Sequence, residues 1–234
     1  MCEHEKLFRK FLNILKSPKK YNYGFSLAEI LITLGIIGIV ATIVLTSVSL
    51  NYKKKVIATR LEKVYSDLLQ ALKMSELENG PCDNWDWTNF DNWYKSDSFA
   101  NEYLFNYMAG TKAEVYHHGD WFPKSPSGGK VFRTNKIHSW NDVLIGFSGG
   151  SVIGNNTKYE YSTLLILVDI DGLKGKDTFG ADVFVFSLSR DGKLTPYCSN
   201  STRTVMLNDN RGVCGSAIIS LDGWKIADDY PYKL

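Results

Sequence analysis

The hydrophobic pattern divides the chain into an apolar N-terminal run, an amphipathic segment, and a region of short apolar stretches. From Phe25 to Leu50 the residues are apolar or small, with one carboxylate, Glu29, close to the start. A membrane-spanning helix needs about 20 such residues, so this run is long enough to cross a bilayer. A charged side chain inside such a helix costs roughly 2.5–3.5 kcal/mol, which suggests that Glu29 has a specific use.

After the apolar run, hydrophobic residues recur at alternating intervals of four and three, which predicts an amphipathic helix. Its apolar face consists of Ile57, Leu61, Val64, Leu68 and Ala71. Asn79-Gly80-Pro81 is a helix stop signal. One helix is therefore predicted from Phe25 to about Asn79, roughly 80 Å long at 1.5 Å per residue.

Beyond Pro81 the sequence contains runs rich in β-branched and aromatic residues, separated by Gly, Asn and Asp. The predicted strands are Val131–Ile137, Val143–Phe147, Thr163–Ile170 and Ala181–Leu188, and a short helix is predicted at Glu102–Ala109. Asp191-Gly192 is a tight-turn signal. Short turns favour an antiparallel sheet, and the apolar helical face is predicted to cover it, which gives an α+β fold.

The segment Gly24-Phe25-Ser26-Leu27-Ala28-Glu29 resembles the cleavage and methylation motif of the type IV pilin and type II secretion pseudopilin family. The resemblance rests on a glycine, an aromatic residue, a carboxylate four residues later, and an unbroken apolar helix. It implies that a prepilin peptidase cuts after Gly24 and that Phe25 is N-methylated. It also implies the ladle-shaped pilin fold, with a long helix packed on a C-terminal antiparallel sheet. Many family members have a proline late in the apolar run; Thr46 stands there, which predicts a straighter helix or a weaker kink.

The sequence shows no recognisable arrangement of a nucleophile, a base and an orienting group, so we expect a structural subunit and not an enzyme. The resemblance names what such a subunit would assemble with. Its partners would be other pilin or pseudopilin subunits in a helical homo- or hetero-fibre, and an inner-membrane assembly platform. In the fibre, Glu29 of one subunit neutralises the new amine of Phe25 in the next. Before assembly, the apolar run lies in lipid of the bacterial inner membrane, with the N-terminus in the cytoplasm and the C-terminal domain outside it.

The predicted organisation is a leader at 1–24, a transmembrane and fibre-core helix at 25–50, its amphipathic continuation at 51–80, and a head domain at 81–234. The leader holds six basic and two acidic residues, and positive flanks stay in the cytoplasm. Lys53-Lys54-Lys55 lies on the other side of the apolar run, so the flanking charges agree with this rule only in part. Removing the leader from a chain with 27 basic and 25 acidic residues leaves 21 and 23, a net charge of −2. This charge gives no indication of nucleic-acid binding.

An acidic, glycine-rich loop lies between two predicted strands. Its carboxylates are Asp169, Asp171, Asp177 and Asp182, interspersed with Gly172, Gly175 and Gly180. Oxygen ligands of this kind suit Ca²⁺, although no Glu closes the loop at the twelfth position as in an EF-hand. The alternative is an acidic hairpin loop in which Lys174 and Lys176 are local counter-charges.

Four cysteines are present, of which Cys2 belongs to the leader. Similar C-terminal pairs in type IV pilins imply a disulfide between Cys198 and Cys214, worth roughly 3 kcal/mol for a loop of this length. Cys82 is then either free or the true partner of one of these two residues.

The remaining candidates are weaker. Aromatic residues crowd the region after Pro81, either as a carbohydrate-binding face or as a cover over the sheet edge and the helix: Trp85, Trp87, Phe90, Trp93, Tyr94, Phe99, Tyr103, Phe105 and Tyr107. His117-His118 has no third metal ligand at a suitable spacing, and Ser125–Lys130 is a turn without the spacing of a phosphate-binding loop. The alternative function is a single-pass, membrane-anchored binding module for a sugar or Ca²⁺.

Overall fold

A computed structural model describes residues 24–87, 95–110, 112–116, 123–129, 131–132, 134, 137–149, 152–153, 160–161, 163–172, 174–175 and 177–234. The chain divides into two compact units, Met1–Val48 and Ser49–Leu234. Apart from Gly24, the predicted leader lies outside the described residues.

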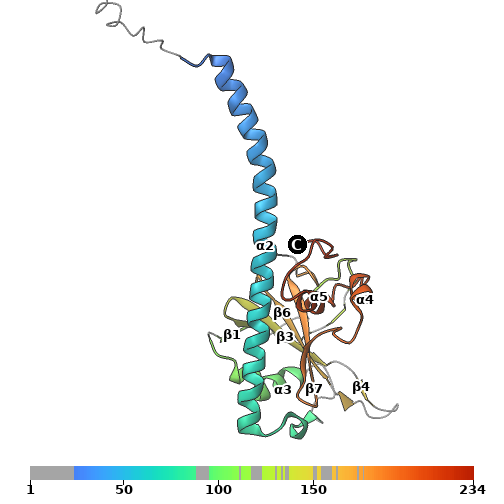
Figure 1. The fold of residues 1–234 in the computed structure, drawn as a ribbon. Helices are drawn as coiled ribbons and strands as arrows, with labels where there is room; N and C mark the ends of the chain where they lie inside the picture. Colours follow the sequence, from blue (N-terminus) through green and yellow to red (C-terminus); the bar gives the residue numbers. More distant parts are fainter. Residues whose placement is uncertain are drawn as a thin grey trace, which may run out of the picture. The chain divides into compact units, whose positions relative to one another are not determined.

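The longest element is the helix α2, Leu27–Asn79, which begins in the first unit and is continuous through Thr46 (Figure 1). In the first unit its apolar side chains are exposed; Ile37 and Leu45, for example, keep 61% and 66% of their surface. Within the part of the chain that the structure describes, no helix is both long enough and apolar enough to cross a membrane.

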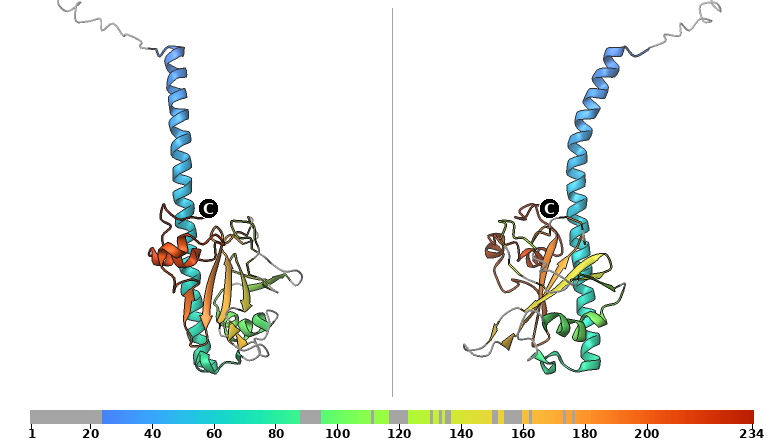
Figure 2. Two further views of the ribbon diagram at one scale, coloured as in Figure 1. Left: turned by 90° about the vertical axis from the view of Figure 1, so that its right-hand side faces the viewer. Right: turned by 180° about the vertical axis from the view of Figure 1, so that it is seen from behind.

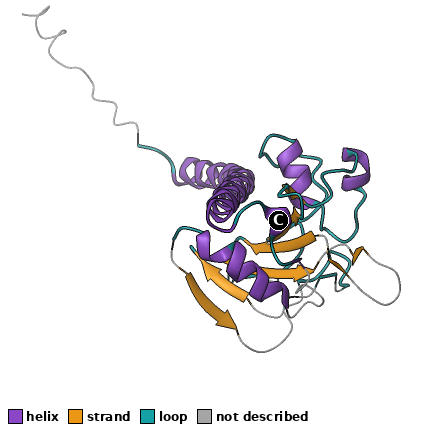
Figure 3. Ribbon diagram, turned by 90° about the horizontal axis from the view of Figure 1, so that it is seen from below, coloured by secondary structure: helices purple, strands orange, loops and turns teal. Residues whose placement is uncertain are grey.

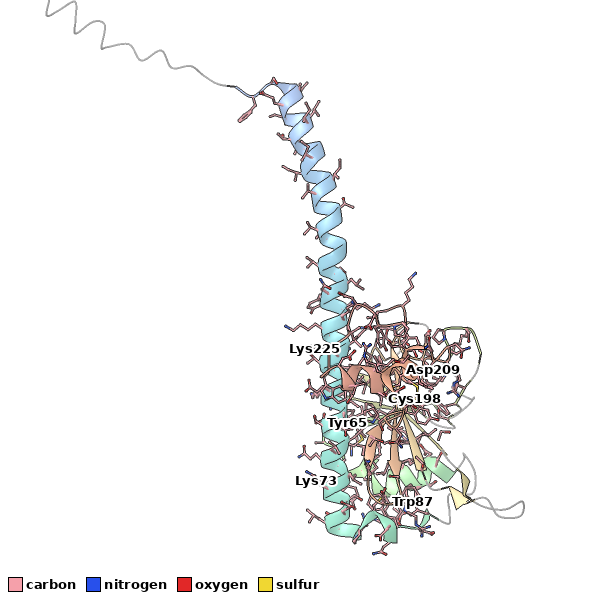
Figure 4. The ribbon with its side chains drawn as sticks, turned by 45° about the vertical axis from the view of Figure 1, so that its right-hand side comes forward. Tyr65, Lys73, Trp87, Cys198, Asp209 and Lys225 are labelled. Carbon is pink, nitrogen blue, oxygen red and sulfur yellow. A yellow bond between two sulfur atoms is a disulfide. The ribbon has the colours of Figure 1, made fainter. Side chains whose placement is uncertain are left out.

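In the second unit, α2 packs through the apolar face that the sequence predicts. Ile57, Val64 and Ala71 are buried, and Leu61 and Leu68 have no exposed surface. Tyr65 points from α2 toward the sheet and stacks on Phe186, with ring centroids 5.6 Å apart (Figure 4). The helix ends at Asn79 as predicted, because Gly80 takes a left-handed φ of 79° that residues with a side chain rarely adopt.

Six of the described strands form one antiparallel sheet, in the order β1-β2-β3-β6-β7-β8. The strands are β1 (Lys112–Tyr116), β2 (Ile137–Trp140), β3 (Val143–Gly149), β6 (Thr163–Asp169), β7 (Val183–Ser189) and β8 (Leu194–Pro196). A separate two-stranded ribbon pairs β4 (Val152–Ile153) with β5 (Glu160–Tyr161). A long helix and an antiparallel sheet confirm the α+β fold class.

The two faces of the sheet belong to different hydrophobic cores. Successive side chains of a strand point to opposite faces, so Ile166 and Phe186 pack with α2 while Leu167 and Val185 join a second core. That second core includes residues of two short helices, α4 (Arg203–Leu207) and α5 (Gly215–Leu221). In Figure 3, α2 is seen nearly along its axis with the strands beside it.

One predicted strand and one predicted helix differ in position from the elements of the structure. Of the predicted strand Val131–Ile137, the described residues Val131 and Phe132 lie outside any strand, and only Ile137 belongs to the strand that pairs with β3, Ile137–Trp140. Strand propensity alone cannot choose between adjacent runs, because a strand needs a neighbour to pair with. The predicted helix Glu102–Ala109 is replaced by α3 (Lys95–Tyr103) and a 3₁₀ turn, η3 (Phe105–Tyr107).

The other strand predictions are close to the structure. Val143–Phe147 and Thr163–Ile170 correspond to β3 and β6, and the predicted Ala181–Leu188 is shifted to Val183–Ser189. The Asp191-Gly192 turn joins β7 to β8, where Gly192 has a φ of 77° and its N–H donates to the carbonyl of Ser189 at 2.9 Å. Strands β1 and β8 were not predicted, because each is short and lies at an edge of the sheet.

Candidate functional site

The processing motif lies at the exposed start of α2. Gly24, Phe25 and Ser26 precede the helix without regular structure, and the side chain of Phe25 is 81% exposed. A peptide bond in an extended, exposed segment is accessible to a peptidase, whereas one inside a helix is not. The bond between Gly24 and Phe25 therefore lies where cleavage is sterically possible.

Ser26 and Glu29 cap the first turn of α2. The Glu29 carboxylate accepts hydrogen bonds from the Ser26 backbone N–H at 2.8 Å and from its hydroxyl at 3.0 Å. In return, the backbone N–H of Glu29 donates to Ser26 Oγ at 3.2 Å. This reciprocal pair is a capping box, which satisfies backbone donors that have no partner within the helix.

The capping box gives Glu29 a local role besides the intersubunit pairing that the resemblance implies. A carboxylate in the first turn also interacts favourably with the positive end of the helix dipole. The sequence contains the signal for this role, because Ser followed three residues later by Glu at the start of an apolar run is an N-terminal helix signature. Ser26 is thus a site residue that the sequence reasoning missed.

The acidic loop places a buried carboxylate at the end of β6. The Asp169 side chain has no exposed surface, and its Oδ1 accepts a hydrogen bond from the Asp171 backbone N–H at 3.1 Å. Asp169 Oδ2 and Asp171 Oδ1 are buried and have no hydrogen-bond partner among the described residues. Buried carboxylate oxygens without a partner are costly unless they are protonated or bind a cation.

Gly175 has no side chain, which leaves room beside it for the carboxylates of Asp171 and Asp182. Gly175 has a φ of 107°, and a side chain added there would meet Asp171 Oδ2 at 2.9 Å and Asp182 Oδ2 at 3.3 Å. Asp182 is held at its Oδ1 by the backbone N–H of Thr178. No three acidic, histidine or cysteine groups among the described residues form a ready-made metal site. Residues 173 and 176 of this loop, which include Lys176, lie outside the described residues.

Burial dominates the electrostatics of this loop. It raises the pKa of Asp169 to about 9, and the neighbouring carboxylates of Asp171 and Asp177 act in the same direction. Burial also raises the pKa of Asp182, and the same two carboxylates again contribute. The loop therefore concentrates acidic groups whose charged forms are disfavoured by burial and by one another.

The C-terminal cysteines form the predicted disulfide. Cys198 and Cys214 are joined, with their Cα atoms 5.3 Å apart, and enclose the segment that contains α4 (Figure 4). Cys82 is a free, buried thiol. Burial raises its pKa to about 12, with a further contribution from Glu76.

The aromatic cluster after Pro81 is part of the core. Trp85, Trp87, Phe99 and Phe105 are buried in the cluster that α2 shares with the sheet. Trp85 stacks on Tyr103 with ring centroids 4.8 Å apart. The interpretation as a cover is correct for these residues, and they offer no exposed carbohydrate-binding face. Phe90, Trp93, Tyr94 and His117-His118 lie outside the described residues.

A buried polar pair is a second feature that the sequence did not indicate. His138 Nε2 lies 2.6 Å from Asp97 Oδ1, and Asp97 Oδ2 accepts a hydrogen bond from Asn101 at 3.1 Å. The pair connects α3 to β2 beneath the rings of Phe105 and Phe147. Because Asp97 and His138 are buried and their named polar atoms are paired, this feature positions α3 on the sheet.

Comparison with known proteins identifies two regions. Residues 47–234 match a family described as "Family of unknown function (DUF6613)". Residues 19–45 match a prokaryotic N-terminal methylation motif. Neither a curated protein nor a solved structure matches the chain.

The methylation motif confirms the resemblance to the pilin and pseudopilin family. It marks the chain as a prepilin-type substrate and a pilin-type structural subunit. It also implies processing by a prepilin peptidase and assembly with other pilin subunits. Prepilin-type proteins are anchored in a membrane before they assemble.

Proposed function

We propose that this chain, which belongs to the DUF6613 family of unknown function, is cleaved after Gly24, N-methylated on Phe25, and assembled into a type IV pilus or type II secretion pseudopilus. The match of residues 19–45 to the methylation motif carries this proposal. Before assembly the subunit is held in the bacterial inner membrane, with its N-terminus in the cytoplasm. An assembly platform in that membrane then transfers it to the fibre.

The exposed apolar surface of the first unit supports this role. Leu31, Ile36, Ile39 and Val40 each keep more than half of their surface exposed in the single chain. Burying apolar surface is worth about 25 cal/mol per Å², so a helix with this surface is stabilised by lipid or by other apolar helices. Membrane insertion followed by packing in a fibre core supplies both environments in turn.

Cleavage would change the electrostatics at the helix start. It creates an amine on Phe25, next to the Ser26–Glu29 capping box. In a fibre core of low dielectric, a carboxylate and an amine of neighbouring subunits attract strongly, and unpaired charges are costly. The pairing of Glu29 with Phe25 of the next subunit would therefore favour one register between subunits.

Mass spectrometry of the mature protein tests this proposal. The full chain is expressed with a prepilin peptidase, and its N-terminal peptide is sequenced. We expect the peptide to begin with methylated Phe25, and a Gly24→Glu variant to keep its leader. An intact N-terminus beginning at Met1 would reject the proposal and would favour a membrane-anchored binding module.

A second candidate function, cation binding by the acidic loop, is favoured by the two buried oxygens without partners in Asp169 and Asp171. We propose that Asp169, Asp171, Asp177 and Asp182 hold a hard cation such as Ca²⁺. Carboxylate oxygens are the ligands that Ca²⁺ prefers, and its irregular coordination can be met by side chains from several positions of one loop. The ion would neutralise charges that the fold buries between β6 and β7.

Thermal unfolding with added Ca²⁺ and with a chelator tests the second candidate. We expect Ca²⁺ to raise the unfolding temperature of the wild type and to leave Asp171→Asn and Asp182→Asn variants unaffected. Glu62→Gln, which changes an exposed carboxylate of α2, is the control and should respond like the wild type. An unchanged wild-type curve across Ca²⁺ and Mg²⁺ concentrations would rule out the cation site.

A further inference from the structure

A lysine-lined pocket of about 380 Å³ lies within the second unit, between the beginning of its part of α2 and the C-terminal segment. Lys54 and Lys55 line it from α2, and Lys225 lines it from the segment after α5. The rest of the lining consists of Asn51, Ala58, Thr59, Trp224, Ile226 and Asp228. Both views of Figure 2 show the C-terminus beside α2.

The charges of the pocket are only partly compensated. Lys54 Nζ donates to Asp228 Oδ1 at 2.9 Å and to the carbonyl of Ala227 at 3.5 Å. The Lys54 side chain is only 17% exposed and forms part of the pocket wall, whereas the Asp228 side chain is fully exposed. Lys55 and Lys225 are exposed, and neither has an ion pair within the described residues. The pocket therefore carries excess positive charge at its opening.

The apolar part of the pocket is held rigidly. Trp224 has a left-handed φ of 55°, which is unusual for a residue with a large side chain. It is kept there by a hydrogen bond from its N–H to the carbonyl of Ile219 at 2.8 Å and by its ring contact with Tyr65 at 5.3 Å. Backbone conformations of this kind persist where the surroundings hold them in place and often mark functional positions.

The position of the pocket along the chain indicates its environment. Asn51 directly follows Leu50, the last residue of the apolar run. At 1.5 Å per residue, Lys54 and Lys55 lie about 6–8 Å beyond that run, within the headgroup layer of a bilayer if the run spans the membrane. Lysine and tryptophan are both residues of this layer, because they combine an apolar body with a polar or charged end.

We propose that this pocket binds the headgroup of an anionic phospholipid in the membrane that holds the subunit before assembly. Lys55 and Lys225 bind the phosphate, Asn51 and Thr59 offer hydrogen bonds to glycerol hydroxyls, and Trp224 and Ile226 contact the glycerol backbone. The inference rests on the proposed function, because it needs the apolar run to lie in lipid. It also accounts for Lys54 and Lys55, two of three consecutive lysines that the positive-inside rule does not explain on the outer side of the membrane.

Lipid retention on the full-length chain tests this inference. The protein is purified in neutral detergent, mixed with equal amounts of phosphatidylglycerol and phosphatidylcholine, and examined by native mass spectrometry. We expect the wild type to retain phosphatidylglycerol preferentially. A Lys55→Glu/Lys225→Glu variant should lose this preference by roughly tenfold or more, given the attraction between lysines and anionic lipids. Asp228→Asn, which releases the charge of Lys54, should strengthen it.

A matched control separates a specific pocket from general charge. Lys63→Glu/Lys73→Glu changes two exposed lysines of α2 by the same net charge and should keep the preference. Equal loss in both double variants would overturn the inference, as would a wild type without preference for phosphatidylglycerol. Competition by inorganic phosphate alone would also overturn it, since the site would then bind a soluble anion. Circular dichroism of each variant establishes that it is folded.

The same samples distinguish failure of this inference from failure of the proposed function. A chain that begins with methylated Phe25 and shows no lipid preference would reject the lipid site alone. If the Lys55→Glu/Lys225→Glu variant retains phosphatidylglycerol but does not form fibres, the lysines belong to a subunit contact and the lipid site is rejected. An unprocessed chain beginning at Met1 would reject the proposed function, whatever lipid it retains.

Discussion

The carboxylate of Glu29 accepts a hydrogen bond from the backbone N–H of Ser26 at 2.8 Å, across the first turn of α2. This relationship means that a residue resembling the assembly carboxylate of pilins also caps the helix that contains it. The two roles need different chemistry. Capping needs a hydrogen-bond acceptor, whereas pairing with the amine of another subunit needs a negative charge.

Substitutions at this pair should separate capping from assembly. Glu29→Gln keeps an acceptor but removes the charge, so we expect normal cleavage after Gly24 and a severe loss of fibres. Ser26→Ala keeps the charge and should weaken the start of the helix by about 1 kcal/mol, with fibres still formed. Immunoblots of leader removal and electron microscopy of fibres measure the two effects. Fibre loss in Ser26→Ala equal to that in Glu29→Gln would show that capping, and not charge, is what assembly requires.

The apolar face of α2 should dominate the stability of the second unit. Leu61 and Leu68 are fully buried against the sheet, so Leu61→Ala or Leu68→Ala should lower the free energy of unfolding by about 2–5 kcal/mol. Leu77→Ala is the matched control, because Leu77 lies on the same helix with 87% of its surface exposed. We expect its effect to stay within about 0.5 kcal/mol. Urea unfolding of the full chain in neutral detergent gives these values; similar losses at Leu61 and Leu77 would contradict the packing described here.

The cysteines should differ sharply in their chemistry. Removing the Cys198–Cys214 bond, which spans 16 residues, by a double substitution to serine should cost roughly 3 kcal/mol of stability. Cys82 is buried and burial raises its pKa to about 12, so its thiol should resist alkylation at pH 8 until the protein unfolds. Mass spectrometry after iodoacetamide treatment, with and without denaturant, measures this. Rapid labelling of native Cys82 would show that it is accessible.

The buried carboxyl of Asp169 should make stability depend on pH. Its pKa is raised from 3.8 to about 9 in the fold, mainly by burial, so the protonated form is the one that the fold favours. In metal-free protein, the stabilising contribution is complete below about pH 4 and is lost as pH rises toward 9, by at most about 1.4 kcal/mol per pH unit. Asp169→Asn keeps the shape without the charge and should flatten this dependence between pH 5 and 8.

Chelator-treated protein, unfolded in urea at several pH values, measures the effect of Asp169. Glu62→Gln serves as the control and should retain the wild-type profile, because Glu62 is exposed on α2. If Asp169→Asn keeps the wild-type slope as well, another group causes the pH dependence.

Local patterns in the sequence were sufficient to predict the helix α2 and the processing motif at its start. The spacing of Ile57, Leu61 and Val64 defines one helical face whatever packs on it, and Gly80 ends the helix through its own backbone freedom. The motif from Gly24 to Glu29 is likewise contiguous. Strands β3, β6 and β7 were predicted because each is a run rich in β-branched and aromatic residues, bounded by Gly, Asn and Asp.

Only the tertiary structure decided the features that join distant segments. The edge strands β1 and β8 depend on a neighbour for their hydrogen bonds, so the sequence of each was uninformative by itself. The same holds for the burial of Trp85 and Trp87, which composition alone could not distinguish from an exposed binding face. The lysine pocket brings Lys55 together with Lys225, and the acidic loop leaves oxygens of Asp169 and Asp171 without partners. Helical periodicity and capping are properties of neighbouring residues, whereas burial, charge compensation and strand pairing depend on which distant residues the fold brings together.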